Sequence, residues 1–181
     1  MLNLSCKKKP LTEEYFLHKD GVQWKYKIYD ETGYFTREFS GTTRIGDTTL
    51  QNWVQITYDE EGQTLASDTS YILATDTMVS FFEDLNADGY VLLKLPMEVD
   101  TTWTFYIDEE PITAQVVSKE EYSVQAGTFP DVYAIKYDYP ENEETRWIYY
   151  APNVGIIRDA LYDSDGELES ADELVEYPVG D

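Results

Sequence analysis

The most specific chemical motif in the sequence is Asp84-x-Asn86-x-Asp88, followed at once by Gly89. Oxygen ligands at loop positions 1, 3 and 5 and a glycine at position 6 match the start of a calcium-binding loop. A complete EF-hand also needs a bidentate glutamate at position 12, where this chain has Leu95. We therefore expect no helix–loop–helix calcium sensor. A weaker calcium site in a β-hairpin is one interpretation of the motif, and a hairpin turn without metal is the other.

Residues for nucleophilic catalysis are sparse. A serine or cysteine nucleophile is normally activated by a neighbouring base, most often histidine. The chain has one histidine, His18, and one cysteine, Cys6, and both precede residue 20. No Gly-x-Ser-x-Gly elbow or phosphate-binding glycine loop occurs, and zinc would need histidine or cysteine ligands that residues 20–181 lack. We therefore expect no enzyme of these classes.

Paired carboxylates are the remaining catalytic option, because glycoside hydrolysis needs only two acids at a set separation. Adjacent acids occur at Glu109-Glu110, Glu120-Glu121 and Glu143-Glu144. Neighbouring residues on a strand point to opposite faces, so these pairs are more simply explained as loop decoration. A carboxylate-dependent glycan hydrolase is therefore the less favoured alternative to a non-enzymatic protein.

The charge of the chain limits its partners. It has 36 acidic residues against 13 basic ones, for a net charge of −23. Nucleic acids and anionic bilayers need a basic surface, so we expect no nucleic-acid partner and no membrane contact except through an N-terminal lipid anchor. With 16 Tyr, 7 Phe and 4 Trp, the chain has enough aromatic surface to fold despite this charge.

The residues named above must be positioned mainly by β-strands. Trp24, Tyr26 and Ile28 alternate with Lys25 and Lys27, which is the pattern of a half-buried strand. Bends that combine acids with glycine separate such runs, as in short hairpin loops; they are Tyr29–Gly33, Tyr58–Gly62 and Tyr162–Gly166.

Sequential hairpins of this kind predict an all-β fold. We expect an antiparallel meander of about twelve to fourteen strands that forms an open curved barrel or a sandwich. The run Ala74–Glu83 is compatible with either strand or helix. Residues 20–181 are expected to form a single β domain, preceded by a tail or tether at residues 1–19. Trp24, Trp53, Trp103 and Trp147 are expected in the core, and some of the many tyrosines should line a concave face open to water.

The N-terminal residues suggest how the domain is held. Leu4-Ser5-Cys6 fits the last positions of a bacterial lipobox, and Lys7-Lys8-Lys9-Pro10 reads as a tether. We expect Cys6 to be acylated, which would place the protein in the bacterial cell envelope, facing the periplasm or the outside; the alternative is a free thiol in the N-terminal tail. Lys7 directly after Cys6 suits retention at the outer membrane by analogy with the lipoprotein sorting rule.

The segment Arg146–Arg158, RWIYYAPNVGIIR, resembles the W-x-x-x-A-P-x-V-G-x-V-K ending of uncharacterised bacterial envelope lipoproteins. Tyr122–Phe129 resembles their V-x-V-P-A-G-x-F turn. The matched residues also have structural roles to fill: Trp147 packing in the sheet, Pro152 starting a turn, and Gly155 allowing a bulge or close packing.

That lipoprotein group is more distantly similar to the open β-sheets of periplasmic lipoprotein carriers, whose concave face holds acyl chains. The resemblance implies a non-enzymatic lipoprotein that binds an apolar molecule, a glycan or a partner protein. A structural or assembly component without a small ligand is the alternative. A large apolar cavity would favour the lipid ligand, a flat apolar patch an assembly role, and an isolated buried acid pair in a cleft a hydrolase.

Overall fold

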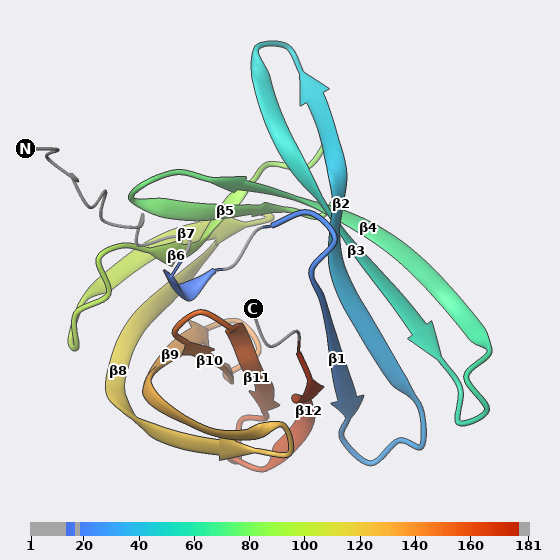
Figure 1. The fold of residues 1–181 in the computed structure, drawn as a ribbon. Helices are drawn as coiled ribbons and strands as arrows, with labels where there is room; N and C mark the ends of the chain where they lie inside the picture. The colour runs from blue at the N-terminus through green and yellow to red at the C-terminus, as the bar shows by residue number, and fades with distance from the viewer. Residues whose placement is uncertain (1–13, 17–18, 178–181) are drawn as a thin grey trace, which may run out of the picture.

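The computed structural model describes residues 14–16 and 19–177, and its fold is one sheet of twelve strands (Figure 1). The strands in chain order are β1 (Gln23–Ile28), β2 (Tyr34–Ile45), β3 (Thr48–Tyr58), β4 (Thr64–Ala74), β5 (Met78–Phe82), β6 (Tyr90–Lys94), β7 (Thr102–Ile107), β8 (Glu110–Val124), β9 (Gly127–Tyr139), β10 (Glu144–Ala151), β11 (Gly155–Tyr162) and β12 (Leu168–Glu176).

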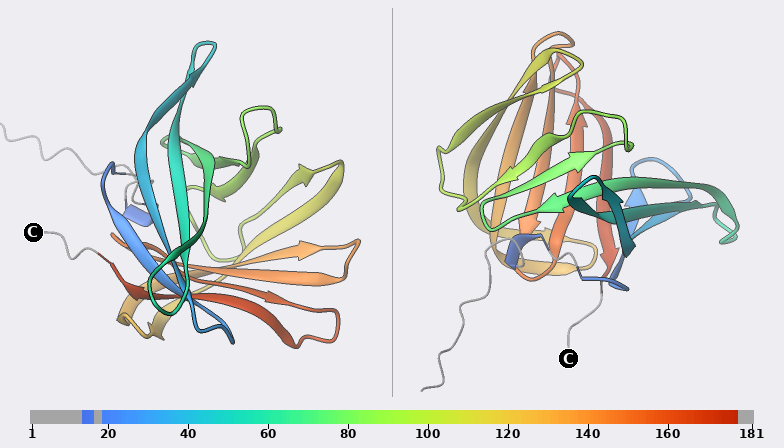
Figure 2. Two further views of the ribbon diagram at one scale, coloured as in Figure 1. Left: turned by 90° about the vertical axis from the view of Figure 1, so that its right-hand side faces the viewer. Right: turned by 90° about the horizontal axis from the view of Figure 1, so that it is seen from above.

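The sheet curves until strands from the two ends of the chain pair with each other. β1 forms an antiparallel ladder with β12, so the order is β6-β5-β4-β3-β2-β1-β12-β11-β10-β9-β8-β7. The two sheet edges are therefore β6 and β7, which face each other across an unsealed seam in a nearly closed barrel (Figures 1 and 2). The predicted all-β meander is confirmed, and it forms the barrel rather than the sandwich. The ambiguous run Ala74–Glu83 contains strand β5.

The turns follow from the acid and glycine pattern in the sequence. Asp59 accepts the backbone N–H of Gln63 with its side chain, and Gly62 has φ +79°. Asp163 does the same for Asp165 and Glu167. Asx turns of this kind replace missing backbone partners where a strand reverses, so each hairpin is closed locally.

The N-terminal segment fills one end of the barrel interior. Phe16 is 3% exposed and contacts the rings of Phe39 and Trp53 edge-on, at centroid distances of 5.9 and 5.7 Å. Tyr15 contacts Tyr133 in the same way at 5.2 Å. The polar side chains of the interior begin directly beside these rings, since the guanidinium carbon of Arg37 lies 5.2 Å from the ring centroid of Trp53.

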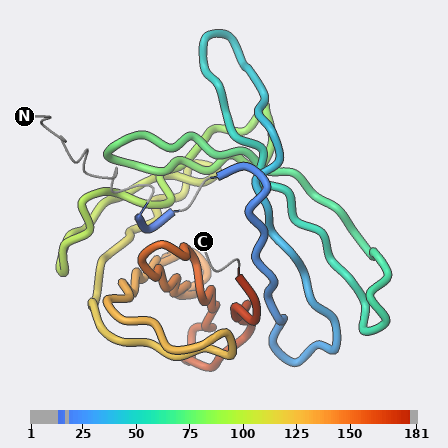
Figure 3. Tube along the Cα trace, in the orientation of Figure 1, coloured from blue at the N-terminus to red at the C-terminus, as the bar shows by residue number. Residues whose placement is uncertain are grey.

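The long β8–β9 hairpin curls around the sheet and its tip reaches β12. Ala126 N–H donates to the carbonyl of Leu174 (3.1 Å), and Gln125 N–H donates to Glu173 Oε1 (3.0 Å). Figure 3 shows this curl as the yellow to orange turn of the trace. These bonds hold the tip of the hairpin against β12. Among the described residues, none belongs to a helix long and apolar enough to cross a membrane.

Candidate functional site

An arginine occupies the inner face of β2 where the alternation otherwise places apolar side chains. Arg37 lies between Phe35 and Phe39, each 2% exposed. Its guanidinium carbon is 5.2, 4.7 and 5.2 Å from the ring centroids of Tyr26, Phe35 and Trp53. Three aromatic faces therefore hold this cation in a fixed position, through contacts that attract cations to the negative face of a ring.

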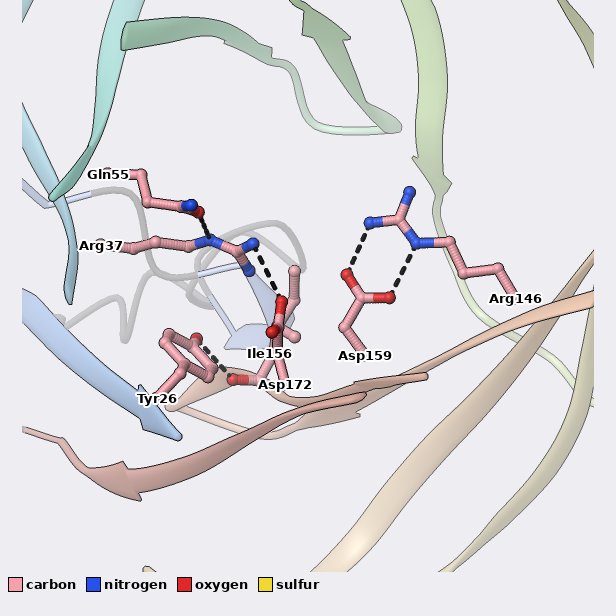
Figure 4. A network of polar contacts seen from close by, with 7 residues as sticks. All are labelled: Tyr26, Arg37, Gln55, Arg146, Ile156, Asp159 and Asp172. Atoms are coloured by element: carbon pink, nitrogen blue, oxygen red, sulfur yellow. Dashed lines mark hydrogen bonds and ion pairs between the residues drawn. The ribbon is translucent and has the colours of Figure 1, made fainter. Parts of the chain in front are cut away.

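Two aspartates from the opposite wall complete a polar network (Figure 4). Arg37 donates from Nε to Gln55 Oε1 (2.9 Å), and its Nη2 lies 3.5 Å from Asp172 Oδ2. Arg146 of β10 donates from Nε and Nη2 to the two oxygens of Asp159 on β11, at 2.7 and 2.5 Å. This two-point geometry is the strongest form of the arginine–carboxylate pair.

The two aspartates are cross-strand partners in the β11–β12 ladder, so both ion pairs belong to one network. Burial raises the pKa of Asp172 to about 6, because its contact with Arg37 compensates only part of the lost hydration. Burial opposes ionisation of Asp159 as well, but the charge and hydrogen bonds of Arg146 outweigh it and hold the pKa of Asp159 below its ordinary value. Asp159 is therefore firmly ionised, and Asp172 gains a proton in mildly acidic solution.

This network forms one wall of a cleft of about 370 Å³, here called the interior cleft. Its volume falls in the range of small-ligand sites, which often lie in the mouths of β-barrels. The lining combines donors, acceptors and one aromatic ring: Arg37, Tyr139, Asn142, Glu144, Arg146, Asp159, Leu161, Ser170 and Asp172.

The apolar end of the interior offers far less room. A cavity of about 20 Å³ remains among the rings of Phe16, Trp24, Phe39 and Trp53. That volume suits about one water molecule. Among the described residues, Phe16 thus fills much of this end, and binding of an apolar molecule stays a prediction.

A second cleft opens at the barrel seam. At one end of the seam, side chains join the two edges: Trp103 of β7 donates from Nε1 to the carbonyl of Val91 on β6 (3.1 Å), and the hydroxyl of Tyr137 donates to the carbonyl of Leu92 (2.6 Å). At the other end the edges diverge into a cleft of about 890 Å³, the seam cleft, with the rings of Tyr90 and Phe105 stacked at 5.1 Å within it. The remaining lining residues are Glu83, Asn86, Ala87, Asp88, Gly89, Val91, Tyr106, Ile107, Asp108 and Glu109.

The predicted calcium motif lies in the β5–β6 loop, beside the seam cleft. Asp84 uses Oδ1 to accept the backbone N–H groups of Asn86 (2.6 Å) and Ala87 (3.0 Å). Asn86 and Asp88 line the cleft. Within residues 14–16 and 19–177, no three His, Cys, Asp or Glu side chains are grouped as metal ligands would be. Calcium binding stays a prediction, and an unchanged melting temperature with and without calcium would contradict it.

The other predicted site residues have structural surroundings. Cys6 lies outside the described residues. Trp147 is half-buried and stacks on Tyr149 at 6.5 Å.

Pro152 lies in the β10–β11 turn and Gly155 begins β11 with φ +98°. The carbonyl of Val154, within the same turn, accepts Trp24 Nε1–H at 2.8 Å. The lipoprotein-like segment thus closes a hairpin and fastens it to β1.

The arginine–aspartate network was not foreseen from the sequence, although a signal was present. In a strand with period-two alternation, a charge on the apolar face must be buried or enter a cleft. Arg37 stands between two inward phenylalanines, and Arg146 shares the face of Ile148 and Tyr150. The acidic pairs of the sequence, by contrast, do not form this site.

Comparison with known proteins gives the fold a context. No family model matches the chain, and neither does any curated protein. A protein from Bacteroides fragilis, assigned as exported and as having a YmcC-like fold, is 17% identical with a TM-score of 0.59, covering 92% of this chain and 99% of its own. A protein from Parabacteroides distasonis assigned as a lipoprotein is 16% identical with a TM-score of 0.55, covering 89% and 96%. The chain is similar to both over nearly its whole length, which establishes a shared fold.

Proposed function

We propose that the chain is a lipid-anchored protein of the bacterial cell envelope whose barrel binds a neutral glycan in the interior cleft without altering it. Two lines of support bear on the location. The sequence around Cys6 fits a lipobox, and the structural neighbours carry assignments as an exported protein and a lipoprotein. Cys6 would carry the acyl chains, and the barrel would face the periplasm or the outside.

The observation that carries the ligand class is the charge balance of the interior network. Two arginines are matched by two aspartates at fixed positions, so these four groups have no net charge when both aspartates are ionised. Glu144 also lines the cleft, which leaves the lining as a whole with one acid in excess. Sugar hydroxyls both donate and accept hydrogen bonds, and such a site offers both kinds of partner at short range. The aspartates would repel an anion and the arginines would repel a cation, whereas neither would repel a neutral polyol.

The same cleft argues against the apolar ligand. Burying an acyl chain against charged groups would cost their hydration without giving them new partners. The small apolar cavity beside Phe16 has room for about one water molecule. A glycan can instead place its polar edge on Arg37 and Arg146 and an apolar face on the ring of Tyr139, which lines the cleft.

Hydrolysis is the alternative that the network itself raises. Asp159 and Asp172 are cross-strand partners on the neighbouring strands β11 and β12. Their pKa values are shifted in opposite directions, which is a feature of acid–base pairs in glycosidases. A hydrolase would need Asp159 as a nucleophile or base. Its two oxygens are instead held by Arg146 at 2.7 and 2.5 Å. We therefore favour binding without catalysis.

Titration calorimetry with a panel of neutral soluble oligosaccharides tests this proposal. Ser170 is exposed and lines the cleft, so Ser170→Trp should fill the cleft and weaken binding at least about tenfold, or about 1.4 kcal/mol. Ser67→Trp, at an exposed position of β4, is the matched control and should leave binding unchanged.

Failure of every neutral oligosaccharide to bind would contradict the proposal, as would equal binding by both variants. Reducing ends released by the wild type but not by Asp172→Asn would show a hydrolase instead.

A further inference from the structure

The open end of the seam exposes a sheet edge. Side chains from β7 and β9 bond to β6 carbonyls at the closed end, whereas Tyr106 of β7 at the open end is 64% exposed. β7 pairs with β8 along one side and is an edge strand of the sheet along the other. Sheet edges with free backbone groups accept an added strand from another chain.

The rim of the seam cleft is acidic on both sides. Glu83 and Asp88 come from the β5–β6 loop, Asp108 and Glu109 come from the β7–β8 turn, and all four are exposed. Among the residues that the structure describes, no lysine or arginine lines the cleft. At the same end, a hydrogen bond with Glu141 raises the pKa of the Glu110 carboxyl, which shows how closely acids are placed there.

These acids are spread along the cleft rather than gathered around one point. Within the described part of the chain, no three of them are placed to share a metal ion. An elongated ligand with several separate positive charges fits this distribution better than a single ion does. A second copy of this chain does not fit, because each copy carries a net charge of −23 and the two would repel.

We propose that the seam cleft binds an extended, lysine- or arginine-rich segment of a partner protein, which pairs with the open edge of β7. Its backbone would bond to the edge near Tyr106, and its basic side chains would meet the four rim carboxylates. Inward-facing side chains of the segment would contact the stacked rings of Tyr90 and Phe105, 5.1 Å apart. The seam cleft shares no lining residue with the interior cleft, so peptide binding can be tested apart from glycan binding, although the charge of Arg146 reaches Tyr90.

Fluorescence anisotropy with a labelled peptide of alternating lysine and valine tests the proposal on the full chain. The peptide should bind at about 50 mM NaCl and weaken at least about tenfold at about 500 mM, because rim charges are screened by salt. A peptide with proline in place of each valine keeps the charge but cannot pair with a strand, and it should not bind.

A pair of variants with equal charge separates the site from general attraction. Glu83→Gln, Asp88→Asn, Asp108→Asn and Glu109→Gln together should weaken the peptide at least about tenfold, since they remove the rim charges. Glu60→Gln, Glu61→Gln, Asp165→Asn and Glu167→Gln together change exposed acids that do not line the seam cleft, and they should weaken it less than about twofold because salt screens charges that are not in contact with the peptide. Amide signals of Thr102–Ile107 should shift on binding.

Equal loss in both variants, or equal binding of the proline peptide, would overturn the proposal. Binding that appears only after Lys7, Lys8 and Lys9 are replaced by serine would also overturn it, because the basic segment of the chain itself would then be the occupant. The Ser170→Trp variant should bind the peptide as the wild type does.

Discussion

The interior cleft and the seam cleft belong to the same barrel but differ in the burial and pairing of their carboxylates. In the interior cleft, Asp159 is 8% exposed and Asp172 is 26% exposed, and each faces an arginine. In the seam cleft, four exposed carboxylates have no basic residue beside them in the lining that the described residues form. A buried charge must be paired because it has lost its water, whereas an exposed charge remains hydrated without a partner.

The difference teaches what each region can bind. The paired network presents fixed donors and acceptors with little net charge, which suits a neutral polar ligand. The unpaired rim keeps a negative field that attracts a basic one. Charge balance therefore distinguishes the two clefts, although both are lined by aromatic rings and carboxylates.

The largest expected effect separates the two regions by stability. Arg146→Met keeps much of the side-chain length but leaves Asp159 buried without its cation, and it should lower the free energy of unfolding by about 3–5 kcal/mol. Glu109→Gln at the seam should change it by no more than about 0.5 kcal/mol. Urea denaturation measures both. A loss below about 1 kcal/mol in Arg146→Met would mean that the pair is not needed to bury Asp159.

A smaller effect should appear in the pH dependence of stability. Because the pKa of Asp172 is raised to about 6, the folded protein holds this proton more tightly than the unfolded chain does. Its contribution to the free energy of unfolding is therefore largest below about pH 4 and falls as the pH rises to about 6, by on the order of 2 kcal/mol. Asp172→Asn lacks this fall, so its stability relative to the wild type should rise across that window. A constant difference between the two pH profiles would contradict the assignment.

The smallest of these effects concerns the closed end of the seam. Trp103→Phe keeps an aromatic ring but loses the N–H that bonds to Val91, so the free energy of unfolding should fall by about 1–2 kcal/mol. Hydrogen exchange should become faster in β6. Trp147→Phe, on a half-buried ring, is the control and should leave β6 exchange unchanged. Unchanged exchange in Trp103→Phe would show that other contacts close the seam.

Much of the fold was predictable because its signals are local. Alternation over residues such as Trp24, Tyr26 and Ile28, and hairpin bends such as Tyr58–Gly62, indicated an antiparallel meander. The closure of β1 on β12 was not predictable, since it depends on accumulated twist across the whole sheet. The arginine–aspartate site was harder to predict from the sequence than the fold. Arg146 and Asp159 are 13 residues apart and meet only through strand register, and no local motif records that register.

The resemblance to lipoprotein carriers implied an apolar groove, and among the described residues the apolar end of the barrel is filled largely by aromatic side chains. Phe16 precedes the first strand, and its position in the sequence suggests part of a tether. Its side chain is nevertheless only 3% exposed and packs on the rings of Phe39 and Trp53. An aromatic residue from outside the sheet thus packs into this end of the barrel. Tertiary contacts of this kind leave no periodic trace in the sequence.

The measurement that tests the central claim most directly is a titration of the arginine Nε signals by NMR with the neutral oligosaccharide panel. The chain has four arginines, Arg37, Arg44, Arg146 and Arg158, and two of them line the interior cleft. We predict that Arg37 and Arg146 shift saturably with an oligosaccharide that binds, while Arg44 and Arg158 stay in place, and that Ser170→Trp removes the shifts. Shifts absent from Arg37 and Arg146, or equal in all four, would contradict a glycan site in the interior cleft.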